Sequence, residues 1–111
     1  MTDFSADISI YDDEDEGLRL ETPETFLPLL SKALVAAGFK ATRSDVAIEG
    51  TARIPALVEV GLDSGGTFES LTTVVHDTLV AQGIKVSTES FSSPGEKHTR
   101  FNLDNVSAFA R

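Results

Sequence analysis

The chain has 111 residues, of which nine are Lys or Arg and 18 are Asp or Glu, so its formal net charge is −9. A chain of this length fits a single domain over residues 1–111, and its 41% of hydrophobic residues is enough for a core. The absence of cysteine excludes disulfide scaffolds and thiolate metal sites, and the negative charge argues against direct binding to nucleic acid or anionic lipid.

The negative charge is concentrated in the acidic N-terminal segment, residues 1–24. This segment carries nine carboxylates and one arginine, for a net charge of −8, whereas the remaining residues carry a net charge of −1. Alternation at residues 8–11 and 18–21 predicts the two strands of a hairpin. Its loop contains five consecutive acids, which we predict to bind a protein partner because a dense negative tip attracts basic surfaces. These partner-binding candidates are Asp12, Asp13, Glu14, Asp15 and Glu16.

The same acidic run partly matches an EF-hand calcium loop, with Asp12, Glu14 and Glu16 as oxygen ligands. The twelfth position of such a loop needs a bidentate glutamate, but here it falls on Pro23. We therefore expect a solvated hairpin loop or a frayed arm, and no metal site.

An amphipathic helix that ends at Gly38 is predicted next, because glycine readily adopts the left-handed conformation that follows a helix. Thr22 or Thr25 is expected to cap its N-terminus, and Pro28 favours the later start. Its apolar stripe, with the spacing of three and four that one helix face requires, consists of Phe26, Leu29, Leu30, Ala33, Leu34 and Ala37.

A hairpin is predicted after this helix. Val46 and Ile48 form its first strand, and a second strand with strict alternation follows residues 49–51. Pro55 lies in the second strand and favours an edge position for it, because proline cannot donate to a neighbouring strand. The alternating apolar residues of that strand are Ile54, Ala56, Val58, Val60 and Leu62.

An internal similarity at an offset of 45 residues predicts the second helix. Residues 34–40 match residues 79–85 at five of seven positions, within a pseudo-repeat of residues 22–48 and 67–92. Duplication and two independent helices that end at glycine both explain the match. We expect this helix to begin at a Ser64 or Thr67 cap and to end at Gly83, with an apolar stripe of Phe68, Leu71, Val75, Leu79 and Gln82.

Two final strands are predicted around residues 84–88 and 99–103, with a turn at Pro94 and Gly95 between them. The order of elements predicts an α+β fold, a ferredoxin-like βαββαβ sandwich with an extra C-terminal strand. Two helices would cover one face of a mainly antiparallel sheet.

No catalytic constellation is evident. Residues 61–67 have the glycine spacing of a phosphate-binding loop, but Thr67 stands where such a loop needs lysine. His76 and His98 are expected on the surface, and a two-histidine site would require the fold to bring them together. We predict no enzyme activity, no catalytic residues and no cofactor.

One pattern runs from residue 54 to residue 106: a strand and turn at 56–66, the spaced leucines Leu71 and Leu79, Val86, and the closing residues 103–106. By this pattern, residues 54–106 resemble the effector-associated constant component domains of bacterial conflict systems. The chain departs from the family because it lacks the Trp-Leu and the arginine-rich stretch that usually follow the helix. The resemblance implies a non-catalytic adaptor that associates with an effector protein.

Three functions are weighed against each other. The first is a non-enzymatic protein-interaction (adaptor) module of a bacterial conflict or regulatory system, binding through the exposed sheet face, the edge strand that contains Pro55, or the acidic segment. The second is an acidic inhibitor or immunity protein whose Asp/Glu loop blocks a basic or nucleic-acid-binding site on its target. The third is a small-ligand or metal-binding domain.

The N-terminus lacks the features of a secretory signal, which favours a cytoplasmic protein. A homodimer that forms through a sheet edge is compatible with the residues.

Overall fold

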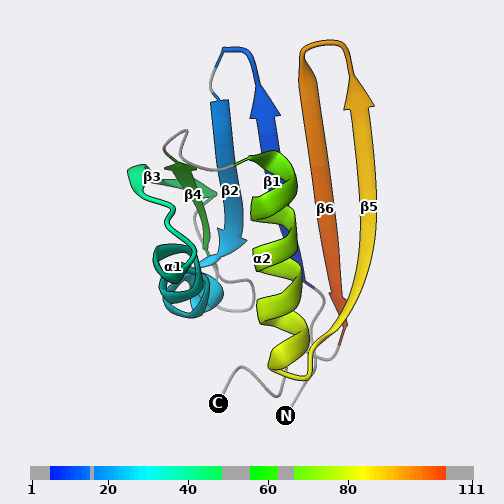
Figure 1. Cartoon of the computed structure of the whole chain (residues 1–111). Coiled ribbons are helices and arrows are strands. Elements are labelled where there is room, and N and C mark those ends of the chain that lie inside the picture. The colour runs from blue at the N-terminus through cyan, green and yellow to red at the C-terminus, as the bar shows by residue number, and fades with distance from the viewer. Residues whose placement is uncertain (1–5, 16, 49–55, 63–66, 105–111) are drawn as a thin grey trace.

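A computed structural model describes residues 6–15, 17–48, 56–62 and 67–104. Along these ranges, pairs of strands alternate with single helices, so that each helix is followed by a hairpin (Figure 1). Their bounds are β1 (Ala6–Asp13), β2 (Gly17–Pro23), the 3-10 turn η1 (Glu24–Phe26), α1 (Leu27–Ala36), β3 (Ala41–Ile48), β4 (Leu57–Leu62), α2 (Phe68–Ala81), β5 (Lys85–Ser93) and β6 (Glu96–Asp104).

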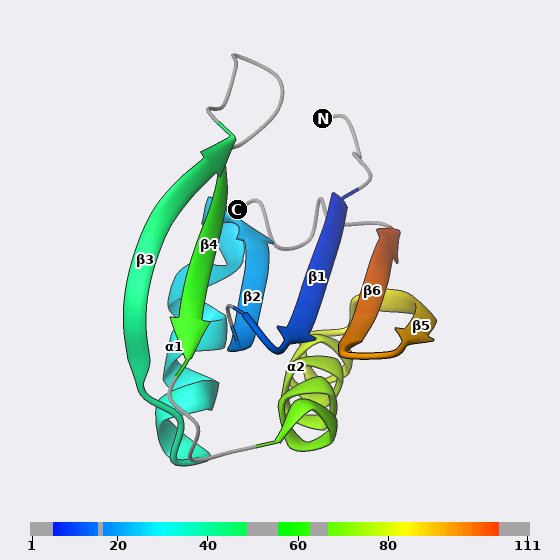
Figure 2. The same cartoon turned by 90° about the horizontal axis from the view of Figure 1, so that it is seen from above.

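The strands form one sheet with the order β3-β4-β2-β1-β6-β5, and every pairing in it is antiparallel. Figure 2 shows that both helices lie on the same side of this curved sheet. Apolar residues of the sheet alternate toward the helices and form a single core with the helix stripes. The core residues that are fully buried are Ile8, Ile10, Leu20, Phe26, Leu30, Leu71, Val75, Leu79, Phe101 and Leu103.

The α+β class and the two helices over an antiparallel sheet agree with the sequence prediction, but the strand order does not match a ferredoxin-like sandwich. In that topology the strand after the second helix lies beside the strand that precedes the first helix. Here β1 and β6 separate β5 from β2. The alternation of apolar residues determines which side chains of a strand face the core, but it does not determine which strand lies next to it.

The two helices begin differently. In α2 the Thr67 side chain accepts a hydrogen bond from the Ser70 N–H, and the Ser70 side chain accepts one from the Thr67 N–H, so the predicted Thr67 cap is confirmed. The expected cap of α1 is wrong, because η1 precedes this helix and Phe26 occupies the cap position without a side-chain bond. Thr22 is instead buried in β2, and its hydroxyl donates to the Pro23 carbonyl.

The predicted ends of the helices and the predicted turn are confirmed. Gly38 and Gly83 follow α1 and α2 with φ of 93° and 79°, and Gly95 forms the β5–β6 turn with φ of 78°. β4 is an internal strand between β3 and β2, so the expected edge position of this strand is wrong; Pro55 itself lies outside the described residues. The 45-residue offset superimposes β3 on β5, and duplication as its origin stays a prediction.

Candidate functional site

The sheet face opposite the helices carries a polar and aromatic surface. In β1, Ile8 and Ile10 point into the core, so Ser9, Tyr11 and Asp13 project from the other side. Because the pairing register is continuous, the residues opposite them in β2 and β6 lie on this same face. We call it the open face, since no described element covers it (Figure 2).

Three rings cross the open face in one row, and we call Tyr11, His98 and Phe91 the aromatic strip. His98 in β6 lies directly opposite Tyr11 in β1 and Phe91 in β5. The Tyr11 and His98 rings stack with centroids 4.4 Å apart, and the Phe91 and His98 rings stack with centroids 5.4 Å apart. The Arg19 guanidinium lies 4.9 Å from the centroid of Tyr11, which extends the row across β2.

His98 faces away from the core, as predicted, but no pattern in the sequence indicated that two rings would enclose it. Burial lowers the pKa of His98 from its ordinary value of 6.5, the nearby Arg100 lowers it further, and Glu96 opposes the shift. Its Nε2 atom is buried and has no hydrogen-bond partner among the described residues. His98 is therefore a neutral, ring-stacking residue at neutral pH.

Arg19 anchors the centre of the open face. Its guanidinium lies 2.7 Å from Asp13 Oδ2 and 3.5 Å from Glu59 Oε2, and its side chain is only 13% exposed. Glu21 lies directly opposite Glu59, and its pKa is raised, first by burial and then by the charge of Glu59. Arg19, on β2, therefore links carboxylates from the two neighbouring strands, β1 and β4.

Negative charge dominates the open face. Six carboxylates project from it, whereas Arg19, Lys85 and Arg100 are the cations on its described part. With His98 neutral, the face carries an excess of three negative charges around the aromatic strip. The six carboxylates belong to Asp7, Asp13, Glu21, Glu59, Glu89 and Glu96.

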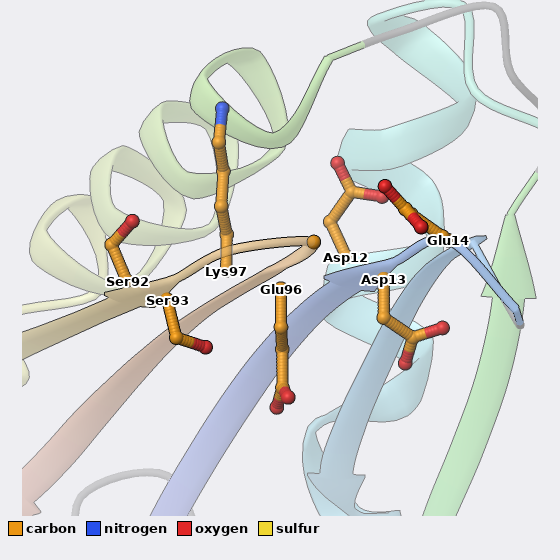
Figure 3. Close-up of a pocket in the computed structure, with 8 residues that line it drawn as sticks. Asp12, Asp13, Glu14, Ser92, Ser93, Glu96 and Lys97 are labelled. Atoms are coloured by element: carbon orange, nitrogen blue, oxygen red, sulfur yellow. The ribbon is translucent and has the colours of Figure 1, made fainter.

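The predicted acidic loop is the tip of the β1–β2 hairpin, and it lies beside the tip of the β5–β6 hairpin (Figure 1). The Glu14 N–H donates to the Gly95 carbonyl over 3.3 Å, which joins the two tips. A hollow of about 290 Å³ lies between them, and Figure 3 shows Asp13 and Glu96 projecting to one side of it while Asp12 and Lys97 project to the other.

Four of the five predicted partner-binding residues lie at this end of the sheet, and Glu16 lies outside the described residues. Asp13 is held by Arg19, and its Oδ1 also accepts a hydrogen bond from the Asp15 N–H. The structure adds Glu96, which the sequence did not indicate because it lies more than 80 residues away along the chain. We call Asp12, Asp13, Glu14, Asp15 and Glu96 the acidic end.

The other candidate ligand sites do not come together. His76 lies on α2, with Nδ1 3.3 Å from Asp77 Oδ1, whereas His98 lies on the open face, so the two histidines are on opposite sides of the sheet. Residues 63–66 of the glycine turn lie outside the described residues. Within the described ranges, no three His, Asp or Glu side chains are grouped as metal ligands. The same ranges contain no helix long and apolar enough to span a membrane.

Comparisons with known proteins indicate the fold but no family. No family model matches the chain, and no curated protein matches it. Among solved structures, the chain is similar to a conserved kinetoplastid-specific protein from Trypanosoma cruzi, with a TM-score of 0.54 and 10% sequence identity. The match covers 92% of this chain and 99% of the other. At this identity the likeness shows a shared fold alone.

Proposed function

We propose that the protein is a non-catalytic protein-interaction module, an adaptor, whose docking surface is the open face. The observation that carries this proposal is the aromatic strip on a sheet face that no described element covers. Tyrosine and arginine are enriched among the residues that dominate binding at protein interfaces. Phe91, at the outer end of the strip, is 50% exposed, and a partner would remove this apolar surface from water.

The excess of carboxylates around the strip favours a partner with a basic surface. Rim charges of opposite sign speed association and select the partner, while the rings supply the apolar contact. The resemblance to effector-associated domains supports the same class of function and extends the proposal to a bacterial conflict or regulatory system.

Affinity capture from cells that carry the gene tests the adaptor function. The bait proteins are the wild type, Tyr11→Ser/Phe91→Ser, and the control Val35→Ser/Val80→Ser, which removes exposed apolar residues from the two helices. Proteins that bind the open face should be retained by the wild type and by the control but lost from the strip variant. Equal retention by all three baits would contradict docking on this face.

A second function, an acidic inhibitor of a basic target site, is favoured by the acidic end. Two hairpins from opposite halves of the chain bring their carboxylates to one hollow, which concentrates negative potential at a projecting end of the sheet. Such an end is suited to occupy a basic, nucleic-acid-binding groove of a target. Asp13 would serve as a fixed member, because Arg19 holds its carboxylate in place.

Charge neutralisation separates the inhibitor from the adaptor. Glu14→Gln/Asp15→Asn removes two exposed charges from the acidic end, and the control Glu24→Gln/Asp77→Asn removes two exposed charges elsewhere. For an inhibitor, the first variant should release a captured partner at clearly lower salt than the wild type, and the control should not. Identical release for both variants would contradict the inhibitor and leave the adaptor unaffected.

A further inference from the structure

β5 forms one edge of the sheet and exposes its outer side. It pairs on one side with β6, in a register that runs without a break from Lys85 opposite Asp104 to Ser93 opposite Glu96. On its other side no described strand is paired. Alternate N–H and C=O groups of this nine-residue strand therefore point away from the sheet, where another strand can bind them.

The opposite edge, β3, is less suited to strand addition. Its pairing with β4 shifts register twice, between Ala41 and Arg43 and between Val46 and Ile48. Such irregularities bend an edge strand and disturb its row of hydrogen-bonding groups. β5 has no such shift, contains no proline, and has one lysine and one glutamate, so its formal charge is zero in a chain of −9.

We propose that β5 pairs in antiparallel fashion with β5 of a second copy of this chain, with the two-fold axis at Thr88. This arrangement extends the sheet across both copies and keeps all helices on one face. Lys85 then lies opposite Phe91 of the partner subunit, and Ser87 lies opposite Glu89 of the partner subunit. On the helix side of the sheet, Thr88 lies opposite its symmetry mate.

This register gives the side chains on the open-face side of β5 favourable contacts with the partner subunit. The Lys85 stem and ammonium cover the exposed ring of Phe91 of the partner subunit, a contact that combines apolar burial with a cation–π interaction. Lys85 is also the diagonal neighbour of Glu89 of the partner subunit, within the range of cross-strand ion pairs. Both contacts occur twice because of the symmetry.

Neighbouring registers form fewer of these contacts between the two subunits. An axis at Glu89 would place two glutamates directly opposite each other, which is destabilising. An axis at Ser87 would pair Lys85 with Glu89 but leave Phe91 opposite Gly83, beyond the end of the partner's strand.

The charge distribution of the whole chain is also compatible with this dimer. A two-fold axis perpendicular to the sheet reverses the strand direction, so the acidic ends of the two copies lie at opposite ends of the extended sheet. The most acidic hairpin, β1–β2, is separated from the interface by β6 in each copy. Repulsion between the two acidic segments is therefore weak, and salt screens it further.

Sedimentation and disulfide trapping test the proposal. The wild type should shift from the 11.9 kDa monomer to twice that mass as its concentration rises from about 5 to about 500 µM. Because the chain has no cysteine, single cysteine variants report distances cleanly. Thr88→Cys, at the axis, should form a dimeric disulfide at least about tenfold faster than Ser92→Cys, which is exposed on the same side of the same strand but far from the axis.

Lys85→Glu should weaken the dimer several-fold, since it removes the contacts with Phe91 and Glu89 twice, whereas Lys85→Arg should preserve it. Thermal unfolding of each variant at low concentration verifies that the monomer is intact. A chain that sediments as a monomer at every concentration would overturn the proposal. A dimer in which Thr88→Cys is trapped no faster than Ser92→Cys would overturn it equally, because that dimer would use another surface.

Discussion

Arg19 shows how one side chain organises the open face. It contacts Asp13 and Glu59 and lies over the Tyr11 ring, with 13% of its side chain exposed. Replacing it by methionine keeps most of the stem but leaves partly buried carboxylates without their cation. We expect Arg19→Met to lower the free energy of unfolding by about 1–3 kcal/mol at pH 7, as measured by urea unfolding.

Arg100→Met is the matched control, because Arg100 forms an ion pair with Glu89 on the same face but is much more exposed. Its loss of stability should be far smaller, since exposed ion pairs contribute little. Equal losses for the two variants would mean that Arg19 acts as an ordinary surface residue.

His98 makes stability depend on pH. Its pKa is below 6.5 in the folded chain, because burial and then Arg100 disfavour the imidazolium, whereas the unfolded chain binds a proton at its ordinary value. Between these two values the unfolded state binds more protons, so the free energy of unfolding falls as the pH decreases through 6.5 and toward the folded pKa.

His98→Gln removes this proton linkage. The difference in unfolding free energy between the wild type and this variant should be constant above pH 7 and should move against the wild type as the pH falls to about 5. Urea unfolding at several pH values measures this difference. The raised pKa of Glu21 has the opposite effect on stability, but it is present in both proteins and therefore cancels when the two are subtracted. A constant difference across this range would contradict an enclosed, neutral His98.

The residues that end the helices could be predicted from the sequence, whereas the contact between the three rings of the aromatic strip could not. Gly38 and Gly83 stop helices by a property of their own backbone. Each ring of the aromatic strip lies at a position of its strand where the alternating pattern places polar residues. This position indicates that Tyr11, Phe91 and His98 face away from the core. Their meeting, however, depends on the pairing of three strands, and no single segment encodes that pairing.

At the scale of elements, the two helices differ in how their N-termini are stabilised. α2 has a reciprocal cap between Thr67 and Ser70, whereas α1 begins from η1 without a side-chain cap. Thr67→Ala should therefore lower the free energy of unfolding by about 1 kcal/mol. Thr25→Ala, at the position that the sequence favoured as a cap, should change it by only a few tenths of a kcal/mol. Urea unfolding of the pair measures both, and equal effects would contradict the assigned caps.

The hairpins were predictable as elements because alternation and a turn signal occur close together in the sequence. Two alternating runs with Pro94 and Gly95 between them predicted the β5–β6 hairpin. Two alternating runs with the acidic residues between them predicted the β1–β2 hairpin. The order of the hairpins in the sheet was not predictable in the same way. β1 and β6 both present one apolar face to the helices, and this pattern is equally compatible with a central or an outer position.

For the whole molecule, the sheet order places the β1–β2 hairpin at the centre and the two helix-linked hairpins at its sides. This arrangement brings the tips of β1–β2 and β5–β6 to the same end, where the Glu14 N–H donates to the Gly95 carbonyl over 3.3 Å. Like charges held close together repel each other in the folded chain more than in the extended one. The acidic end should therefore lower stability, as expected if it is the binding surface of the proposed inhibitor.

Glu14→Gln/Glu96→Gln tests this expectation. The variant should raise the melting temperature by roughly 1–3 °C at low salt, because it removes repulsion at the acidic end without changing the shape of either side chain. The gain should disappear in about 1 M salt, which shortens the screening length to roughly 3 Å. Glu24→Gln/Asp77→Asn, with its charges on η1 and α2, should show no comparable salt-dependent gain. A lower melting temperature for the first variant would mean that these carboxylates stabilise the hairpin tips, and the acidic end would then be a structural feature rather than a binding surface.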